Sequence, residues 1–251
     1  MCTLIIGREV LGPGTTILAA NRDEDPARPS DPPHVLAREP LLVGGSDRVA
    51  HGTWLAVRER RAAVAMLNRR LPDSALAPPE RSRGMLALDV AAAAPDAADD
   101  MALGHAARAA ALAAISAARY APFSLVFATR GEAWVLSWDG ASAITDVPTG
   151  WHVLTHSDLD DPDEPRTARL LRELEGFAPS SWDEARRALV ARLAEHDPPA
   201  VCIHDGRMAT VSYALVLLAG DRSRYLHADG RPCEAAPLEF TGLLDKSVTR
   251  S

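Results

Sequence analysis

The order of strand-like and helix-like segments is the feature that most restricts the fold of this sequence. Short apolar runs of strand length fall into two groups, at 3–8, 15–21, 52–57 and 62–68, and at 123–129, 133–138, 143–146 and 151–155. Between the groups, residues 83–119 are rich in alanine with recurring larger apolar residues, which is typical of helices; Pro95 predicts a break between two of them. Further helical patterns occur at 166–175 and 182–196, and the last strands are expected near 210–219, 224–227 and 238–241. This order predicts an α+β fold with sheets stacked between helical layers.

Local signals support these boundaries. Ser82 precedes the first helical pattern as a candidate N-cap, and the series Ser181-Trp182-Asp183-Glu184 has the form of a capping box. Residues 25–40 are rich in proline and charge, which predicts a long surface loop. Because there is neither an internal repeat nor an evident linker, residues 1–251 are expected to form one domain.

Composition excludes several classes of function. The 251 residues carry a formal net charge of −7, which argues against a nucleic-acid partner. Three cysteines without a CxxC pair do not describe a disulfide framework and favour a reducing compartment. There is no apolar run long enough for a membrane span and no visible secretory signal, so a cytoplasmic location is expected.

The cysteine at position two calls for a chemical explanation. Cysteine is small enough that removal of Met1 by a methionine aminopeptidase is expected, which leaves Cys2 with a thiol and a free α-amine. If the first hairpin turns about Gly12-Pro13, Cys2 lies opposite Asp23, and Asn21 shares its face. A slip of one residue would bring Glu24 instead of Asp23. In either register a carboxylate reaches the start of the chain.

This arrangement has a use in catalysis. An α-amine has a reference pKa of about 7.7–8.0 and can accept the proton of a neighbouring thiol, giving the nucleophilic thiolate. Asp23 would hold the resulting ammonium, and Arg22 could orient the substrate or the carboxylate. The alternatives are that Cys2 is a small apolar residue beginning a strand and that residues 21–24 are a polar strand end.

Several motifs resemble one known family. "MCTLII", "AANRDED" and "RPS" are followed by "HGTWLAVRERRAAVAMLNRR", "WHVLTHSDLDDPDEPR" and "VCIHDGRMATVSYALVLLA". In this order they resemble the NRDE family, also called the Transport and Golgi organisation protein 2 family, from Cys2 to about Ala219. That family is similar to N-terminal nucleophile (Ntn) hydrolases, especially the bile-salt and penicillin V amidases.

The resemblance implies a fold and a set of site residues. The fold is an αββα sandwich of two antiparallel sheets between helical layers, and Cys2 is the nucleophile that attacks a carbon–nitrogen amide bond. Asp23 is the partner of its amine, and Asn21 and Arg22 belong to the same motif. Asn68 matches the asparagine that donates to the oxyanion; without the resemblance, it could equally cap a turn before Arg69-Arg70. His156 stands where the amidases have an asparagine and could donate a hydrogen bond in its place.

Three functions follow from these residues. The first is a cysteine amidohydrolase or acyltransferase acting on a small-molecule amide, with no cofactor and no metal. The second is a non-catalytic binding or trafficking protein for haem or an acylated small molecule, which the family's associations include. The third is a metal hydrolase using His152 and His156, with His204 and Asp205; the scattered histidines argue against it. The series Cys202-Ile203-His204 is interpreted as strand packing near the core. The substrate and the oligomeric state are not indicated.

Overall fold

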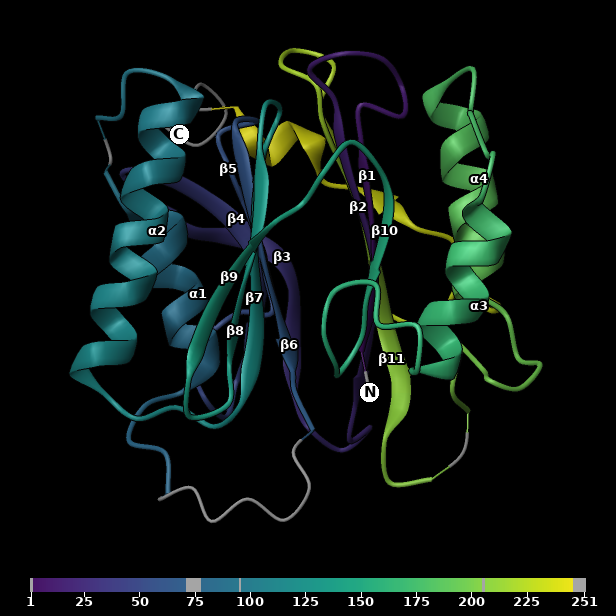
Figure 1. Cartoon of the computed structure of the whole chain (residues 1–251), viewed down its shortest axis with the longest axis horizontal. Coiled ribbons are helices and arrows are strands. Elements are labelled where there is room, and N and C mark those ends of the chain that lie inside the picture. Colours follow the sequence, from purple (N-terminus) through teal and green to yellow (C-terminus); the bar gives the residue numbers. More distant parts are fainter. Residues whose placement is uncertain (1, 71–77, 95, 205, 246–251) are drawn as a thin grey trace.

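The computed structural model describes residues 2–70, 78–94, 96–204 and 206–245. Two antiparallel β-sheets lie face to face, and a pair of helices covers the outer face of each (Figure 1). The helices α1 (Arg83–Ala92) and α2 (Asp100–Ala117) pack on one sheet. The helices α3 (Pro165–Leu174) and α4 (Trp182–Leu193) pack on the other. This arrangement confirms the αββα sandwich; Pro95, the expected break, lies outside the described residues.

The sheet beneath α1 and α2 has seven strands that neighbour one another in chain order. They are β3 (Ser30–Arg38), β4 (Leu41–Asp47), β5 (Leu55–Arg58), β6 (Ala62–Asn68), β7 (Phe123–Thr129), β8 (Ala133–Trp138) and β9 (Ser142–Asp146). The edge strand β3 corrects the prediction of a surface loop over 25–40. Pro32 and Pro33 lie where the pairing of β3 with β4 is interrupted. Proline has no N–H to donate, so its presence there costs no regular hydrogen bond between the two strands.

The second sheet has six strands in the order β10-β1-β2-β11-β12-β13. They are β10 (Gly150–Leu154), β1 (Thr3–Arg8), β2 (Thr16–Glu24), β11 (Ala209–Leu218), β12 (Arg224–Ala228) and β13 (Leu238–Glu239), and a 3₁₀ helix, η1 (Thr241–Leu244), follows. Because β1 lies between β2 and β10, backbone hydrogen bonds hold the start of the chain from both sides. The first strand, β1, is therefore an interior strand of its sheet.

The register of the first hairpin differs from the expected one by one residue. Thr3 lies opposite Asn21 and Arg8 opposite Thr16, whereas a turn about Gly12-Pro13 would pair Leu4 with Asn21. The cause is the connection: residues 9–15 form a wide loop closed by a hydrogen bond from the Glu9 amide to the Thr15 carbonyl (2.8 Å). Glycines at positive φ shape this loop, so no two-residue turn sets the pairing.

Alternating side chains divide the core into three layers. Leu4 and Leu18 point between the two sheets, where they meet residues such as Val57 and Val126 of the other sheet. Their neighbours along the strands, such as Ile5, point toward α3 and α4. A third cluster fills the space between the seven-stranded sheet and α1 and α2. Burial of both faces explains why these strands are continuous apolar runs in the sequence.

The helices begin at residues that cap them. The side chain of Ser82 accepts a hydrogen bond from the Gly84 amide, and that of Ser181 from the Glu184 amide, as the sequence predicts. Glu164 caps α3 in the same way by accepting from the Thr167 amide. Among the described residues, none of the helices combines the length and the apolar character that a membrane span requires.

Candidate active site

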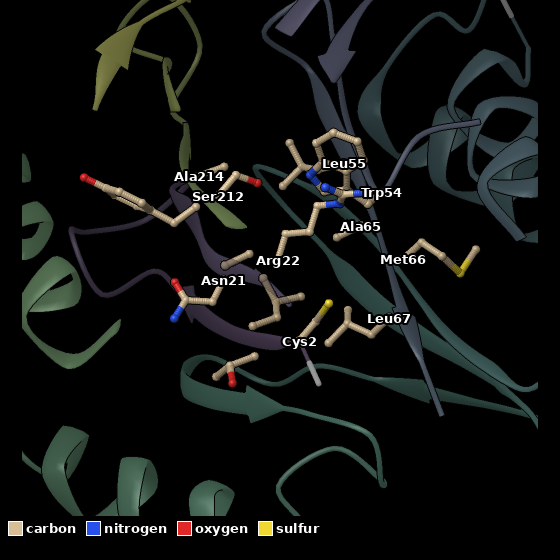
Figure 2. Close-up of a pocket in the computed structure, with 14 residues that line it drawn as sticks. Cys2, Asn21, Arg22, Trp54, Leu55, Ala65, Met66, Leu67, Ser212 and Ala214 are labelled. Carbon is tan, nitrogen blue, oxygen red and sulfur yellow. The ribbon is translucent and has the colours of Figure 1, made fainter. Parts of the chain in front are cut away.

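The Cys2 thiol lies between the two sheets, at the end of the sandwich where β1 begins (Figure 2). Its Sγ is 3.4 Å from the amide nitrogen of Asp23, which donates to it, and 3.7 Å from the carbonyl oxygen of Asp23. Burial raises the pKa of the Cys2 thiol, and the negative charge of Asp23 adds to this effect. Cys2 therefore needs a base to become a nucleophile near neutral pH.

The Asp23 carboxylate lies on the other face of the sheet. Continued by one residue, the observed register of Thr3 opposite Asn21 places Cys2 opposite Arg22, so the expectation that Cys2 and Asp23 share a face is wrong. The Asp23 side chain is directed toward the helices with Thr3, whereas the backbone amide and carbonyl of Asp23 contact the thiol. The Thr210 hydroxyl donates to its Oδ1 at 2.6 Å, and Arg166 Nη1 lies 3.9 Å from its Oδ2.

Arg166 and Thr210 contact Asp23 at the candidate site, and the sequence did not single them out. Arg166 is in the first turn of α3, where its Nη1 also donates to Thr3 Oγ1 at 2.9 Å, and Thr210 is near the start of β11. Both lie within stretches that carry the family resemblance, but a single arginine or threonine gives no local signal. Together they fix a buried carboxylate next to the start of the chain.

Arg22 shares the space between the sheets with Cys2. Its guanidinium carbon lies 4.2 Å from the centre of the Trp54 ring (Figure 2). Nη1 donates to Ser30 Oγ at 3.2 Å. Nη2 is 4.0 Å from a Glu24 carboxylate oxygen. Burial lowers the pKa of Arg22 below its ordinary range, yet an arginine remains charged at physiological pH. A cation thus lies near the thiol.

Asn21 points away from the thiol (Figure 2). Its Nδ2 donates to the carbonyl oxygens of Leu193 (2.8 Å) and Val201 (3.0 Å), at the end of α4 and in the loop that leads to β11. This carboxamide ties the strand to the helical layer. Asn21 therefore anchors the Asn21–Asp23 motif on the helix-facing side of the sheet and does not face Cys2.

A polar cavity of about 220 Å³ opens beside Cys2. Asn68, exposed at the end of β6, lines this cavity together with Cys2. The charged residues of its lining are Arg22, Asp23, Glu24, Arg28, Asp47 and Arg83. A second hollow on the apolar side of Cys2 measures only about 20 Å³, room for little more than one water molecule. The space available to a ligand is therefore the polar cavity.

His156 follows β10 and is absent from the lining of both cavities next to Cys2. Burial lowers the pKa of its imidazole, so the ring is neutral near pH 7. Its buried Nδ1 has no hydrogen-bond partner in the part of the chain that the structure describes. His152 is engaged elsewhere: Nδ1 lies 2.6 Å from Asp160 Oδ2 and Nε2 lies 3.1 Å from the Pro148 carbonyl oxygen. Both nitrogens of His152 are thus engaged within the fold, and Asp205, the acidic residue of the metal hypothesis, lies outside the described residues.

Three solved structures have a fold similar to that of this chain. The chain matches an N-acylethanolamine-hydrolyzing acid amidase ortholog from Caenorhabditis elegans (TM-score 0.57, 15% identity, 87% of this chain and 93% of the other). It also matches a variant of conjugated bile acid hydrolase from Clostridium perfringens (TM-score 0.54, 12% identity, 98% and 94%). A third match is penicillin V acylase from Agrobacterium tumefaciens (TM-score 0.54, 14% identity, 98% and 89%). At these identities the likeness establishes the Ntn-hydrolase fold.

A search of curated protein sequences gave no match. The family model for Transport and Golgi organisation 2, in contrast, matches residues 1–208, which include Cys2, the Asn21–Asp23 motif, Asn68 and His156. The fold, the motifs and this match agree: the chain belongs to the Transport and Golgi organisation 2 family.

Proposed function

We propose that this protein is an N-terminal cysteine amidohydrolase or acyltransferase that acts on the carbon–nitrogen bond of a small-molecule amide after Met1 is removed. The observation that carries the proposal is the placement of the Cys2 thiol at a polar cavity beside Arg22 and Asn68, with the buried Asp23 next to it. The three solved enzymes of similar fold are named for acting on N-acylethanolamines, conjugated bile acids and penicillin V, and this supports an amide or acyl substrate.

Activation begins at the chain start. Removal of Met1 makes the nitrogen of Cys2 an α-amine, which takes the thiol proton and becomes an ammonium. Asp23 holds this ammonium from the helix-facing side of the strand, where Thr210 and Arg166 fix its carboxylate. Because burial raises the pKa of the thiol, the chain that still carries Met1 has a poorly reactive sulfur.

The thiolate then attacks the carbonyl carbon of the amide. A C–S bond forms, the carbonyl π electrons move to the oxygen, and the Asn68 carboxamide donates to this oxyanion. The tetrahedral intermediate collapses with cleavage of the C–N bond, and the leaving nitrogen takes the proton of the ammonium. Water, or another nucleophile in an acyltransferase, then gives a proton to the neutral α-amine and attacks the thioester carbonyl. The C–S bond breaks, the acyl group leaves as the carboxylic acid or the new acyl product, and the sulfur takes the proton back to regenerate the thiol.

Intact-mass spectrometry after exposure to a panel of β-lactams and activated amides tests the proposal. We expect a chain that begins at Cys2 and gains the mass of one acyl group. Cys2→Ala protein is expected to gain none, and peptide mapping of the acylated wild type, with the acyl group on Cys2 and not on Cys233, is the control for labelling at another thiol. A chain that retains Met1 in its native host, or equal acylation of the Cys2→Ala protein, would contradict the proposal. Binding of a panel compound without acylation would favour a non-catalytic binding protein.

A further inference from the structure

A second cluster of reactive side chains lies outside the candidate active site. It consists of His196, Cys202, His204 and Cys233, and their nearest ligand atoms all lie within 4.8 Å of one another. His196 follows the end of α4, Cys202 and His204 lie in the loop before β11, and Cys233 lies in the loop after β12. The segment 202–204 is not a strand, which corrects the interpretation made from the sequence. The tertiary structure thus gathers two thiols and two imidazoles from three segments.

The distances within the cluster fit a tetrahedral ion. With Zn–S bonds of about 2.3 Å and Zn–N bonds of about 2.0–2.1 Å, a tetrahedron separates two sulfurs by about 3.8 Å and a sulfur from a nitrogen by about 3.6 Å. Cys202 Sγ and Cys233 Sγ are 3.7 Å apart, and His204 Nε2 is 3.2 Å from Cys233 Sγ. The rings of His196 and His204 meet edge to face with centres 4.6 Å apart. Only small movements of the four side chains are needed for all four ligand atoms to coordinate one ion.

The surroundings of the cluster also suit a metal. His204 directs Nε2 to the sulfur, while its Nδ1 faces a Glu234 carboxylate oxygen 3.7 Å away, longer than a hydrogen bond but on the side where metal-binding histidines have an outer-shell carboxylate. The amides of Val201 and Cys202 both donate to the Glu195 carbonyl, which fixes the backbone of the loop. A surface hollow lined by His196, Cys202 and His204 gives an ion access from solvent.

We propose that His196, Cys202, His204 and Cys233 form a structural zinc site. Two sulfur and two imidazole ligands in tetrahedral arrangement are the donor set of structural Zn²⁺ sites, and four protein ligands leave no position for a catalytic water. Binding releases the protons of the two thiols to solvent, and the ion joins the end of α4 to the loops before β11 and after β12.

The zinc site lies close to the proposed catalytic machinery. Ile203, between two of the ligands, accepts a hydrogen bond from the Thr210 amide (2.8 Å) and donates to the Thr210 hydroxyl (2.9 Å). The same hydroxyl donates to Asp23. The metal thus stabilises the loop that holds Thr210 against Asp23. The site does not depend on the proposed amidohydrolase activity, because its ligands are separate from Cys2 and its cavity.

Titration of metal-free, reduced full-length protein with Co²⁺ tests the site. We expect one Co²⁺ per chain, with the intense visible absorption of tetrahedral cobalt and a thiolate charge-transfer band, and displacement by one equivalent of Zn²⁺. Cys233→Ser and His204→Ala are expected to lose these bands. Glu234→Gln is expected to weaken binding by roughly 10-fold or more, as for other outer-shell partners.

Two variants serve as controls. Cys2→Ala removes the remaining thiol, and His105→Ala removes an exposed histidine on α2; both are expected to retain the full cobalt spectrum. In the wild type, Zn²⁺ is expected to protect Cys202 and Cys233, but not Cys2, from alkylation, a result that does not depend on the folding of a variant. Weak octahedral binding, a spectrum unchanged in Cys233→Ser, or alkylation unaffected by Zn²⁺ would overturn the proposal.

Discussion

Asn68 is the residue whose side chain can be tested with the least disturbance to the fold. It is exposed at the end of β6 and lines the cavity that contains Cys2. Replacement by alanine is expected to slow acylation of Cys2 by roughly 100–1,000-fold, because an oxyanion donor is lost. The free energy of unfolding is expected to change by no more than about 0.5 kcal/mol, since the site is on the surface.

Stopped-flow or quenched mass spectrometry of the acylated protein measures this rate. The matched control is Arg70→Ala, a truncation of an exposed side chain two residues further along the chain. If Asn68→Ala acylates Cys2 as fast as the wild type, Asn68 is not the donor and its place at the end of β6 serves only the turn.

At the scale of elements, the capping of α3 connects helix stability to the candidate site. Glu164 Oε2 accepts hydrogen bonds from the Thr167 amide (2.7 Å) and from the hydroxyls of Thr167 (2.8 Å) and Thr155 (3.3 Å). It thereby joins the first turn of α3, which carries Arg166, to the residue after β10. Glu164→Ala is expected to lower the free energy of unfolding by about 1–2 kcal/mol because the cap is lost.

Urea denaturation followed by circular dichroism checks this expectation. Glu175→Ala, which truncates an exposed glutamate at the other end of the same helix, is expected to change the stability by less than about 0.5 kcal/mol. Equal effects of the two substitutions would show that the Glu164 hydrogen bonds do not stabilise the helix.

At the scale of the whole molecule, a buried histidine makes folding stability depend on pH. His227 is 3% exposed in β12 and meets the Phe240 ring edge to face. Burial lowers the pKa of its imidazole to about 4. Between the unfolded value of about 6.5 and this folded value, the unfolded chain binds more protons, so the free energy of unfolding falls as the pH is lowered through this window. Over this window, protonation of His227 is expected to lower the free energy of unfolding by on the order of 3 kcal/mol.

Chemical denaturation at pH 7 and at pH 4.5 measures the dependence. His227→Gln cannot take up this proton, so it is expected to show a smaller loss of stability over the interval than the wild type. His105→Gln, at an exposed position of α2, is expected to keep the wild-type dependence. Identical pH dependence of His227→Gln and wild type would contradict the assignment.

Local sequence patterns predicted most of the elements correctly. The strands at 123–129 and 133–138, the two helices within 83–119 and the caps Ser82 and Ser181 depend on periodicity and on side chains that bond to nearby backbone. Such interactions span only a few residues and are therefore visible in the sequence. β3 was missed because its prolines are tolerated at an edge strand with an interrupted register, a property of the sheet and not of the segment.

The sequence by itself determined that Cys2 precedes an apolar strand and that an Asn-Arg-Asp motif lies near the end of the next strand. Only the tertiary structure decided which face each side chain of that motif occupies, because the loop at 9–15 shifts the pairing by one residue and so reverses the face of every side chain relative to its expected partner. It also decided that Arg166 and Thr210 surround Asp23 and that Cys202 and Cys233 meet. These contacts join residues that are far apart in the chain. They form because the two sheets and their helices pack together, and no local sequence pattern records that packing.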